Sequence, residues 1–177
     1  ADRLEQHGLS HSVKERLGEE LIAFEDPDGL PLELIETPLA GSVPENWPGS
    51  PVAAALAVQG LHSTTVLAPA LDATAALLER LGLEPVEEAP ETDNDGQRRR
   101  RIRLAGGLPG RRSYVDLLES ARPQPGRLGA GSIHHLALRV KDEEALLAAR
   151  ELLAEADLTP TKVKNRTYFK SVYFTEP

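Results

Sequence analysis

One short segment of the sequence occurs twice, about 150 positions apart, and this repetition limits the folds that the chain can adopt. The first copy spans 16–27 and the second spans 166–177. Four residue types recur at one spacing, in the pairs Arg16 and Arg166, Phe24 and Phe174, Asp26 and Glu176, and Pro27 and Pro177. Self-similarity at a fixed period is typical of a protein built from repeated structural units. We therefore expect an internal part of a longer repeat protein.

The recurring unit is expected to consist of a strand, a helix and three further strands. Local patterns predict strands at 9–14, 19–25, 30–36, 59–67, 83–88, 98–105, 113–119, 131–140, 158–164 and 168–174. Two helices are predicted to end at Gly8 and Gly82, and a third to span 142–156. The predicted fold class is therefore α+β, with repeated βαβββ units whose curved mixed sheets form half-barrels.

These units divide the chain into four parts. Residues 1–38 are expected to form the C-terminal part of one βαβββ unit, and 39–58 a linker rich in proline and small residues. Residues 59–120 are expected to form a complete unit, and 131–177 the N-terminal part of a further one. The terminal units are incomplete and would expose sheet edges, so a homodimer is a plausible assembly.

The composition argues against several classes of function. A net charge of -8 opposes a general role in binding nucleic acid, which favours clustered positive charge. No apolar run approaches the roughly 18 residues of a membrane span, and no signal peptide is visible, so we expect a cytoplasmic protein without membrane partners. The absence of cysteine excludes disulfides, thiolate metal ligands and thiol nucleophiles.

The arginine-rich run Arg98–Arg101 lies in a predicted hairpin next to the acidic segment 91–95. No aromatic residues interleave with it, as they do in many single-strand nucleic-acid sites. We interpret the run as a solvated strand edge that is protected by its charge. The glycine-rich stretches 106–110 and 126–131 lack the strand-to-helix context of a phosphate-binding loop.

The pair His134 and His135 is the sharpest local signal for chemistry. On a strand, adjacent side chains point to opposite faces, so one of the two would enter the concave side of a curved sheet. Imidazole suits Fe(II), Mn(II) or Zn(II), and two histidines with one carboxylate leave coordination positions open for oxygen and substrate. The alternative is a buried, hydrogen-bonded histidine beside an exposed one.

Three stretches together resemble the vicinal oxygen chelate superfamily: GSIHHLALRV, NRTYFKSVYF and FEDPDGLPLELIE. This superfamily includes glyoxalase I, bleomycin-resistance proteins and extradiol dioxygenases, and the chain is most similar to ring-cleaving dioxygenases that act on hydroquinones. The resemblance implies opening of a small hydroquinone or catechol-like aromatic ring with O2, with Fe(II), or else Mn(II), as cofactor. Two alternatives remain: a glyoxalase-type metal-dependent isomerase or lyase, and a non-catalytic module that binds a small ligand.

The resemblance also implies roles for single residues. His135 matches a metal ligand, His134 matches a histidine that handles substrate protons, and Arg166 and Tyr173 match residues that contact the aromatic substrate. Permanently cationic Arg166 suits an anionic ring oxygen, although a surface ion pair would also explain it. Tyr173 suits a hydrogen bond to substrate or packing in a core. The family's other histidine and glutamate ligands match no position here, so we expect activity in the full-length parent.

A second or vestigial site is suggested by Glu33 and His62, which occupy ligand-equivalent positions in two successive units. Asp116 stands in the slot that corresponds to Glu33. These residues form either a second metal site or a polar-lined cavity without metal.

Overall fold

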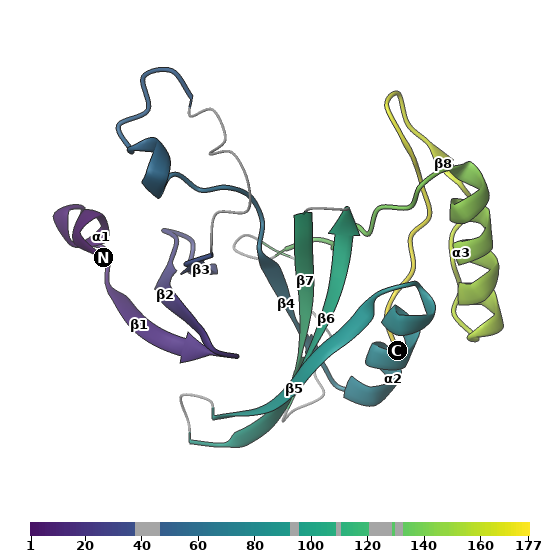
Figure 1. The fold of residues 1–177 in the computed structure, drawn as a ribbon. Coiled ribbons are helices and arrows are strands. Elements are labelled where there is room, and N and C mark those ends of the chain that lie inside the picture. The colour runs from purple at the N-terminus through teal and green to yellow at the C-terminus, as the bar shows by residue number, and fades with distance from the viewer. Residues whose placement is uncertain (38–46, 93–95, 109–110, 121–128, 130–132) are drawn as a thin grey trace. The chain divides into compact units, whose positions relative to one another are not determined.

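The computed structural model describes residues 1–37, 47–92, 96–108, 111–120, 129 and 133–177. The backbone divides into two compact parts, which we call the first and the second lobe. The first lobe comprises Ala1–His62 with Gly126–His134, and the second comprises Ser63–Pro125 with His135–Pro177. Each lobe is described by itself (Figure 1).

The first lobe contains a short helix and a three-stranded antiparallel sheet in the order β1-β2-β3. Its elements are α1 (Asp2–Gln6), β1 (His11–Arg16), β2 (Glu19–Glu25), β3 (Pro31–Ile35) and the 3-10 helix η1 (Ala54–Leu56). Leu17 and Gly18 both have positive φ, as a two-residue hairpin turn requires. In the next turn, Asp26 Oδ1 accepts hydrogen bonds from the backbone N–H groups of Asp28 and Leu30, at 2.9 and 2.8 Å.

The second lobe contains a four-stranded mixed sheet in the order β4-β7-β6-β5. Its elements are β4 (Ser63–Ala68), α2 (Leu71–Arg80), β5 (Glu84–Thr92), β6 (Arg98–Leu108) and β7 (Arg111–Glu119). Strand β4 runs parallel to β7, and the other neighbours are antiparallel. This strand, helix and three-strand order is the predicted βαβββ unit, and the predicted α+β class is confirmed.

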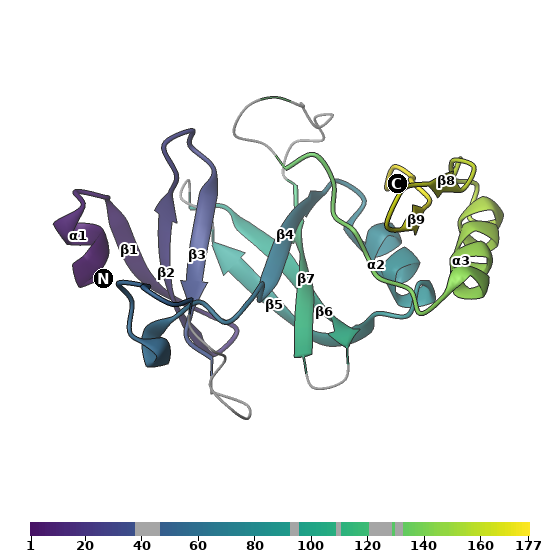
Figure 2. The same cartoon turned by 90° about the horizontal axis from the view of Figure 1, so that it is seen from above.

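Helix α2 covers one face of this sheet with an apolar core (Figures 1 and 2). Leu71, Ala75 and Leu78 follow helical spacing on α2 and face Leu104 and Leu117, which are 0% and 1% exposed. Burying a leucine side chain stabilises a fold by about 2 kcal/mol, so this face holds much of the lobe's stability.

The opposite face of the sheet carries buried charge, so the prediction that Arg98–Arg101 form a solvated strand edge is wrong. Strand β6 is an interior strand, flanked by β5 and β7. Arg101 and Arg103 are 2% and 5% exposed, and Asp116 on β7 is 1% exposed. A run of charged residues in a sequence does not reveal which strands lie on either side of it in the sheet.

The segment after residue 132 differs most from the predicted elements. Ile133–Val140 lies in no strand, because no other described segment pairs with it. Helix α3 (Glu143–Glu155) follows, with the Asp142 carboxylate capping the Ala145 N–H at 2.9 Å. The strands predicted at 158–164 and 168–174 shorten to β8 (Lys164–Asn165) and β9 (Lys170–Ser171), which form a small hairpin.

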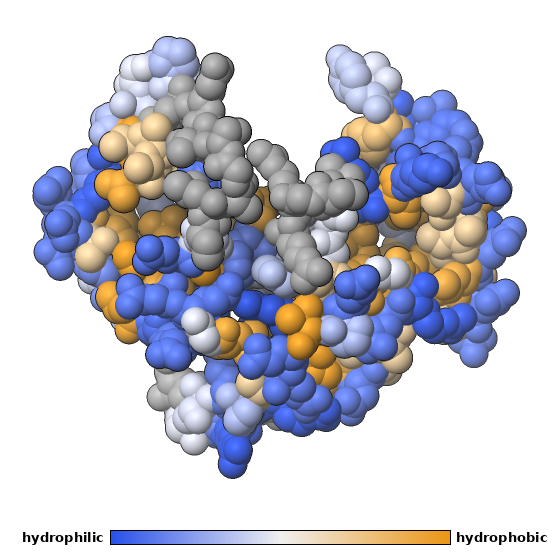
Figure 3. Space-filling model, viewed as in Figure 1, coloured by the Kyte–Doolittle hydropathy of each residue, from blue (hydrophilic) through white to orange (hydrophobic). Residues whose placement is uncertain are grey.

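Hydrophilic side chains cover most of the visible described surface, and apolar residues form small scattered patches (Figure 3). Over the residues that the structure describes, no helix is long and apolar enough to cross a bilayer.

Candidate active site

The β8–β9 hairpin positions two of the predicted site residues. The backbone N–H of Arg166 donates to the carbonyl of Phe169 at 2.8 Å and closes the turn between the two strands. Beyond β9, the backbone of Tyr173 is fixed to Thr161: Thr161 N–H donates to the Tyr173 carbonyl at 2.9 Å, and Tyr173 N–H donates to Thr161 Oγ1 at 3.1 Å. These hydrogen bonds therefore fix the backbone at Arg166 and at Tyr173.

The fold brings His135 to Tyr173, although the two residues are far apart in the sequence. Their ring centroids are 5.9 Å apart and the planes meet at 82°, an edge-to-face contact. His135 belongs to the exposed segment Ile133–Val140, whereas Tyr173 is half-buried. His134, the next residue in the chain, is also exposed.

The surroundings of the Tyr173 hydroxyl favour its anionic form. The nearby Ser171 hydroxyl lowers the pKa of Tyr173 most, the guanidinium and positive charge of Arg166 lower it further, and partial burial opposes both. The Ser171 hydroxyl oxygen is shielded from solvent and has no hydrogen-bond partner within the described part of the chain. Imidazole, phenol and guanidinium thus meet at one place, with a serine hydroxyl beside them.

Two residues at this place were not singled out from the sequence. Ser171 precedes Tyr173 by two positions on an extended segment, so the two side chains share a face. Lys164 is the register partner of Ser171, and paired residues in an antiparallel ladder point to the same side. Spacing by two along 168–174 was the available signal for Ser171; Lys164 needed the strand register.

The described residues do not by themselves complete a metal site. His135 offers one imidazole donor, and within the described ranges no three His, Cys, Asp or Glu side chains gather closely enough to hold a metal ion. The role of His135 as a metal ligand therefore stays a prediction.

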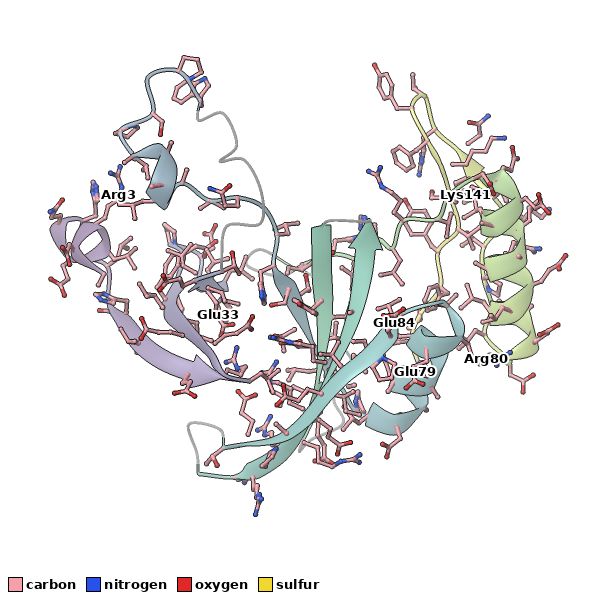
Figure 4. The ribbon with its side chains drawn as sticks, viewed as in Figure 1. Arg3, Glu33, Glu79, Arg80, Glu84 and Lys141 are labelled. Atoms are coloured by element: carbon pink, nitrogen blue, oxygen red, sulfur yellow. The ribbon has the colours of Figure 1, made fainter. Side chains whose placement is uncertain are left out.

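Glu33 and His62 lie in the first lobe, and each contacts the side chain of another residue. Glu33, labelled on β3 in Figure 4, accepts a hydrogen bond from Arg16 Nη1 at 2.6 Å. His62 Nε2 lies 3.0 Å from Glu19 Oε1. Because a guanidinium already neutralises the Glu33 carboxylate, the contacts favour the polar-lined alternative over a second metal site.

Asp116, in the second lobe, is similarly engaged. Arg103 binds both of its carboxylate oxygens, through Nε to Oδ1 at 2.7 Å and Nη2 to Oδ2 at 2.8 Å. Arg101 Nη1 contacts Oδ2 at 3.3 Å and also bonds Thr65 Oγ1 at 3.2 Å. Arg101 Nε pairs with Glu91. This carboxylate is held by two guanidinium groups and is not presented to a metal ion.

Two surface hollows lie on the β5 side of the second lobe, with volumes of about 410 and 550 Å³. Apolar and acidic side chains line the first, with Asp72 and Glu79 among the acidic ones. The second is lined by both acidic and arginine side chains, including Glu88, Arg98 and Arg99. Neither is lined by His135, Arg166 or Tyr173, so neither belongs to the candidate site.

Two of the similar proteins found by comparison are dioxygenases by name. MhqO of Bacillus subtilis, which is assigned as a ring-cleaving dioxygenase, is 33% identical over 175 residues, covering 98% of this chain and 52% of MhqO. The chlorohydroquinone/hydroquinone 1,2-dioxygenase of Sphingobium indicum is 31% identical over 172 residues, or 93% of this chain and 50% of that enzyme. No family model matches the chain.

A crystal structure of a protein assigned as a dioxygenase from Bacillus subtilis matches with 34% identity and a TM-score of 0.74. The match covers 99% of this chain and 53% of that structure. The chain thus spans about half the length of the relatives that it matches.

The βαβββ fold and these relatives agree with the resemblance to the vicinal oxygen chelate superfamily. The relatives are ring-cleaving dioxygenases, the group to which the three sequence stretches are most similar.

Proposed function

We propose that the protein carrying this chain is a ring-cleaving dioxygenase that opens a hydroquinone or catechol-like ring with O2. The observation that carries the proposal is the meeting of His135, Tyr173 and the Arg166 guanidinium at one place, in a homologue of such enzymes. The reaction needs no external reductant, because both oxygen atoms enter the product and the ring supplies the electrons.

In this proposal Arg166 binds a ring hydroxyl as its anion, since guanidinium is charged at every physiological pH. The Tyr173 hydroxyl hydrogen-bonds the same ring and fixes its orientation. His134 exchanges a proton with the second ring hydroxyl, an acid-base role that imidazole commonly serves in enzymes.

We further propose His135 as one ligand of an Fe(II) ion, with Mn(II) as the alternative. One imidazole is a single donor, so further ligands would be needed to complete the metal site. The proposed setting is the cytoplasm, with a small aromatic compound and O2 as the partners.

Oxygen uptake by the purified full-length protein tests this function. After loading with Fe(II) under argon, addition of hydroquinone in air is expected to consume O2 and yield a ring-opened product. Turnover of a thiol conjugate without O2 would instead indicate a glyoxalase-type enzyme. Failure to retain any metal or to consume O2 would indicate a ligand-binding module.

A further inference from the structure

The segment that holds Arg166 and Tyr173 is strongly basic in an otherwise acidic chain. Residues 158–175 contain Lys162, Lys164, Arg166 and Lys170 and not one aspartate or glutamate. The whole chain, in contrast, has 28 acidic against 20 basic residues. The hairpin of the candidate site therefore lies in a segment with an excess of positive charge.

The register of the hairpin separates these cations by face. Lys164 pairs with Ser171 and so shares a face with Ser171 and Tyr173. Lys170 pairs with Asn165, one position along, and points to the opposite face. Its ammonium lies 2.5 Å from Glu143 Oε2 on α3, so its charge is already compensated.

The site face therefore carries two basic side chains, Lys164 and Arg166, beside the Tyr173 phenol. Arg166 lies close enough to the Tyr173 hydroxyl to lower the pKa of this tyrosine, and it is suited to the ring oxygen in the proposed function. Lys164 is exposed and adds a second, compact positive charge that binding of one ring oxygen does not require.

We infer that the site accepts aromatic diols with an additional anionic substituent, such as a carboxylate, and that Lys164 is the residue that selects them. This inference rests on the proposed ring-cleaving function and names its substrate class. A small anion fits better than a polyanion, because the net charge of -8 repels nucleic acid and anionic surfaces.

Binding of matched probes to the full-length protein tests the inference. The probes are 2,5-dihydroxybenzoate and its methyl ester, which differ in one negative charge, titrated under argon by calorimetry. The wild type is expected to bind the carboxylate about fivefold more tightly than the ester, as one partly exposed ion pair allows. Lys164→Met is expected to remove this preference.

Lys170→Met is the matched control, because it removes the same charge from the opposite face of the same hairpin. It is expected to keep the preference for the carboxylate. Equal affinity of the wild type for the two probes, failure to bind either, or an equal loss in both variants would overturn the inference.

A further measurement covers the case in which Lys164→Met does not fold. In the wild type, raising the salt concentration must narrow the preference for the carboxylate, since salt screens exposed charges. A preference that salt leaves unchanged overturns the inference.

The proposed function is judged separately, by O2 uptake with unsubstituted hydroquinone. O2 uptake by a protein that binds the carboxylate and the ester equally well would contradict only the inference about Lys164. A charge preference without uptake removes only the proposed dioxygenase activity.

Discussion

Tyr173 illustrates how single residues acquire their properties from their neighbours. Its hydroxyl faces Ser171 and Arg166, and both favour the phenolate over the phenol. The His135 ring meets the tyrosine ring edge-on. None of these residues has unusual chemistry in isolation, so the reactivity of the site depends on the hairpin that gathers them.

Arg166→Met is expected to raise the pKa of Tyr173 toward that of an ordinary tyrosine. The substitution removes a hydrogen-bond donor and a positive charge, both of which favour the phenolate. Ultraviolet titration of tyrosinate, with Tyr173→Phe subtracted as the background, measures the shift. Arg80→Met, on α2, is the control and should leave the titration unchanged; a Tyr173 pKa that is the same with and without Arg166 would contradict the assigned cause.

Glu176→Gln is expected to raise the melting temperature at neutral pH. Burial raises the pKa of Glu176 above its usual value near 4.5, and the neighbouring Thr74 hydroxyl only partly offsets this. A raised folded-state pKa means that the protonated form suits the fold, so the wild type loses stability as pH rises above the unfolded value. The advantage of the glutamine should therefore shrink below pH 4.5, which thermal melts at two pH values can check.

At the scale of elements, the two faces of the β4-β7-β6-β5 sheet are stabilised in different ways. One face packs apolar residues against α2. The other buries Arg101, Arg103 and Asp116 in a hydrogen-bonded network, with the Tyr114 ring 4.9 Å from the Arg103 guanidinium carbon. Buried ion pairs of this kind are sensitive to removal of one partner and tolerant of complete replacement.

Asp116→Asn is expected to destabilise the protein by about 3 kcal/mol, because the buried Arg103 guanidinium loses the carboxylate that binds it through two hydrogen bonds, while Arg101 keeps Glu91. Replacing all three residues together, as Arg101→Met, Arg103→Met and Asp116→Leu, should recover most of the stability that Asp116→Asn loses. Urea unfolding measures both, with Glu87→Gln as an exposed control. A triple variant less stable than Asp116→Asn would show that the network contributes net stability.

Asp142→Ala is expected to cost about 1 kcal/mol through the loss of the α3 N-cap. The Asp142 carboxylate accepts the Ala145 N–H at 2.9 Å, so the substitution leaves that donor unsatisfied. Denaturant unfolding with Glu151→Ala as the control gives the difference. Equal stability of the two variants would argue against a capping contribution.

At the scale of the whole molecule, the exposed segment Ile133–Val140 is a candidate surface for pairing with a second copy of the chain. Ile133, Leu136, Leu138 and Val140 are each more than a third exposed, the largest fraction being 61% for Ile133. An extended segment with apolar side chains is a template for pairing with another strand. This supports the expected homodimer, which no contact in the structure tests.

Leu138→Lys is expected to shift a dimer toward the monomer, because a charged side chain opposes strand pairing on an apolar face. Light scattering after size-exclusion chromatography reports the molar mass of both proteins. Lys14→Met, on β1, serves as the surface control. A wild type that is monomeric at every concentration would contradict the homodimer.

Much of the fold could be predicted from local patterns. The turn at Asp26 and the helical spacing of α2 and α3 report interactions between residues close in sequence, and those elements formed where they were expected. The second copy of the repeated segment, in contrast, forms only the two-residue strand β9. The resemblance of three stretches to ring-cleaving dioxygenases also agrees with the relatives. Local periodicity was therefore sufficient for the class of fold, whereas the family was indicated by the resemblance of these three stretches.

Tertiary structure alone decided which residues meet. The burial of Arg101 and Arg103 followed from the interior place of β6, and β8 and β9 pair only with each other over two residues each. The contact of His135 with Tyr173 and the placement of Lys164 beside Ser171 depend on chain packing and strand register. Sequence patterns encode neighbours along the chain, whereas the chemistry of this site depends on neighbours in space.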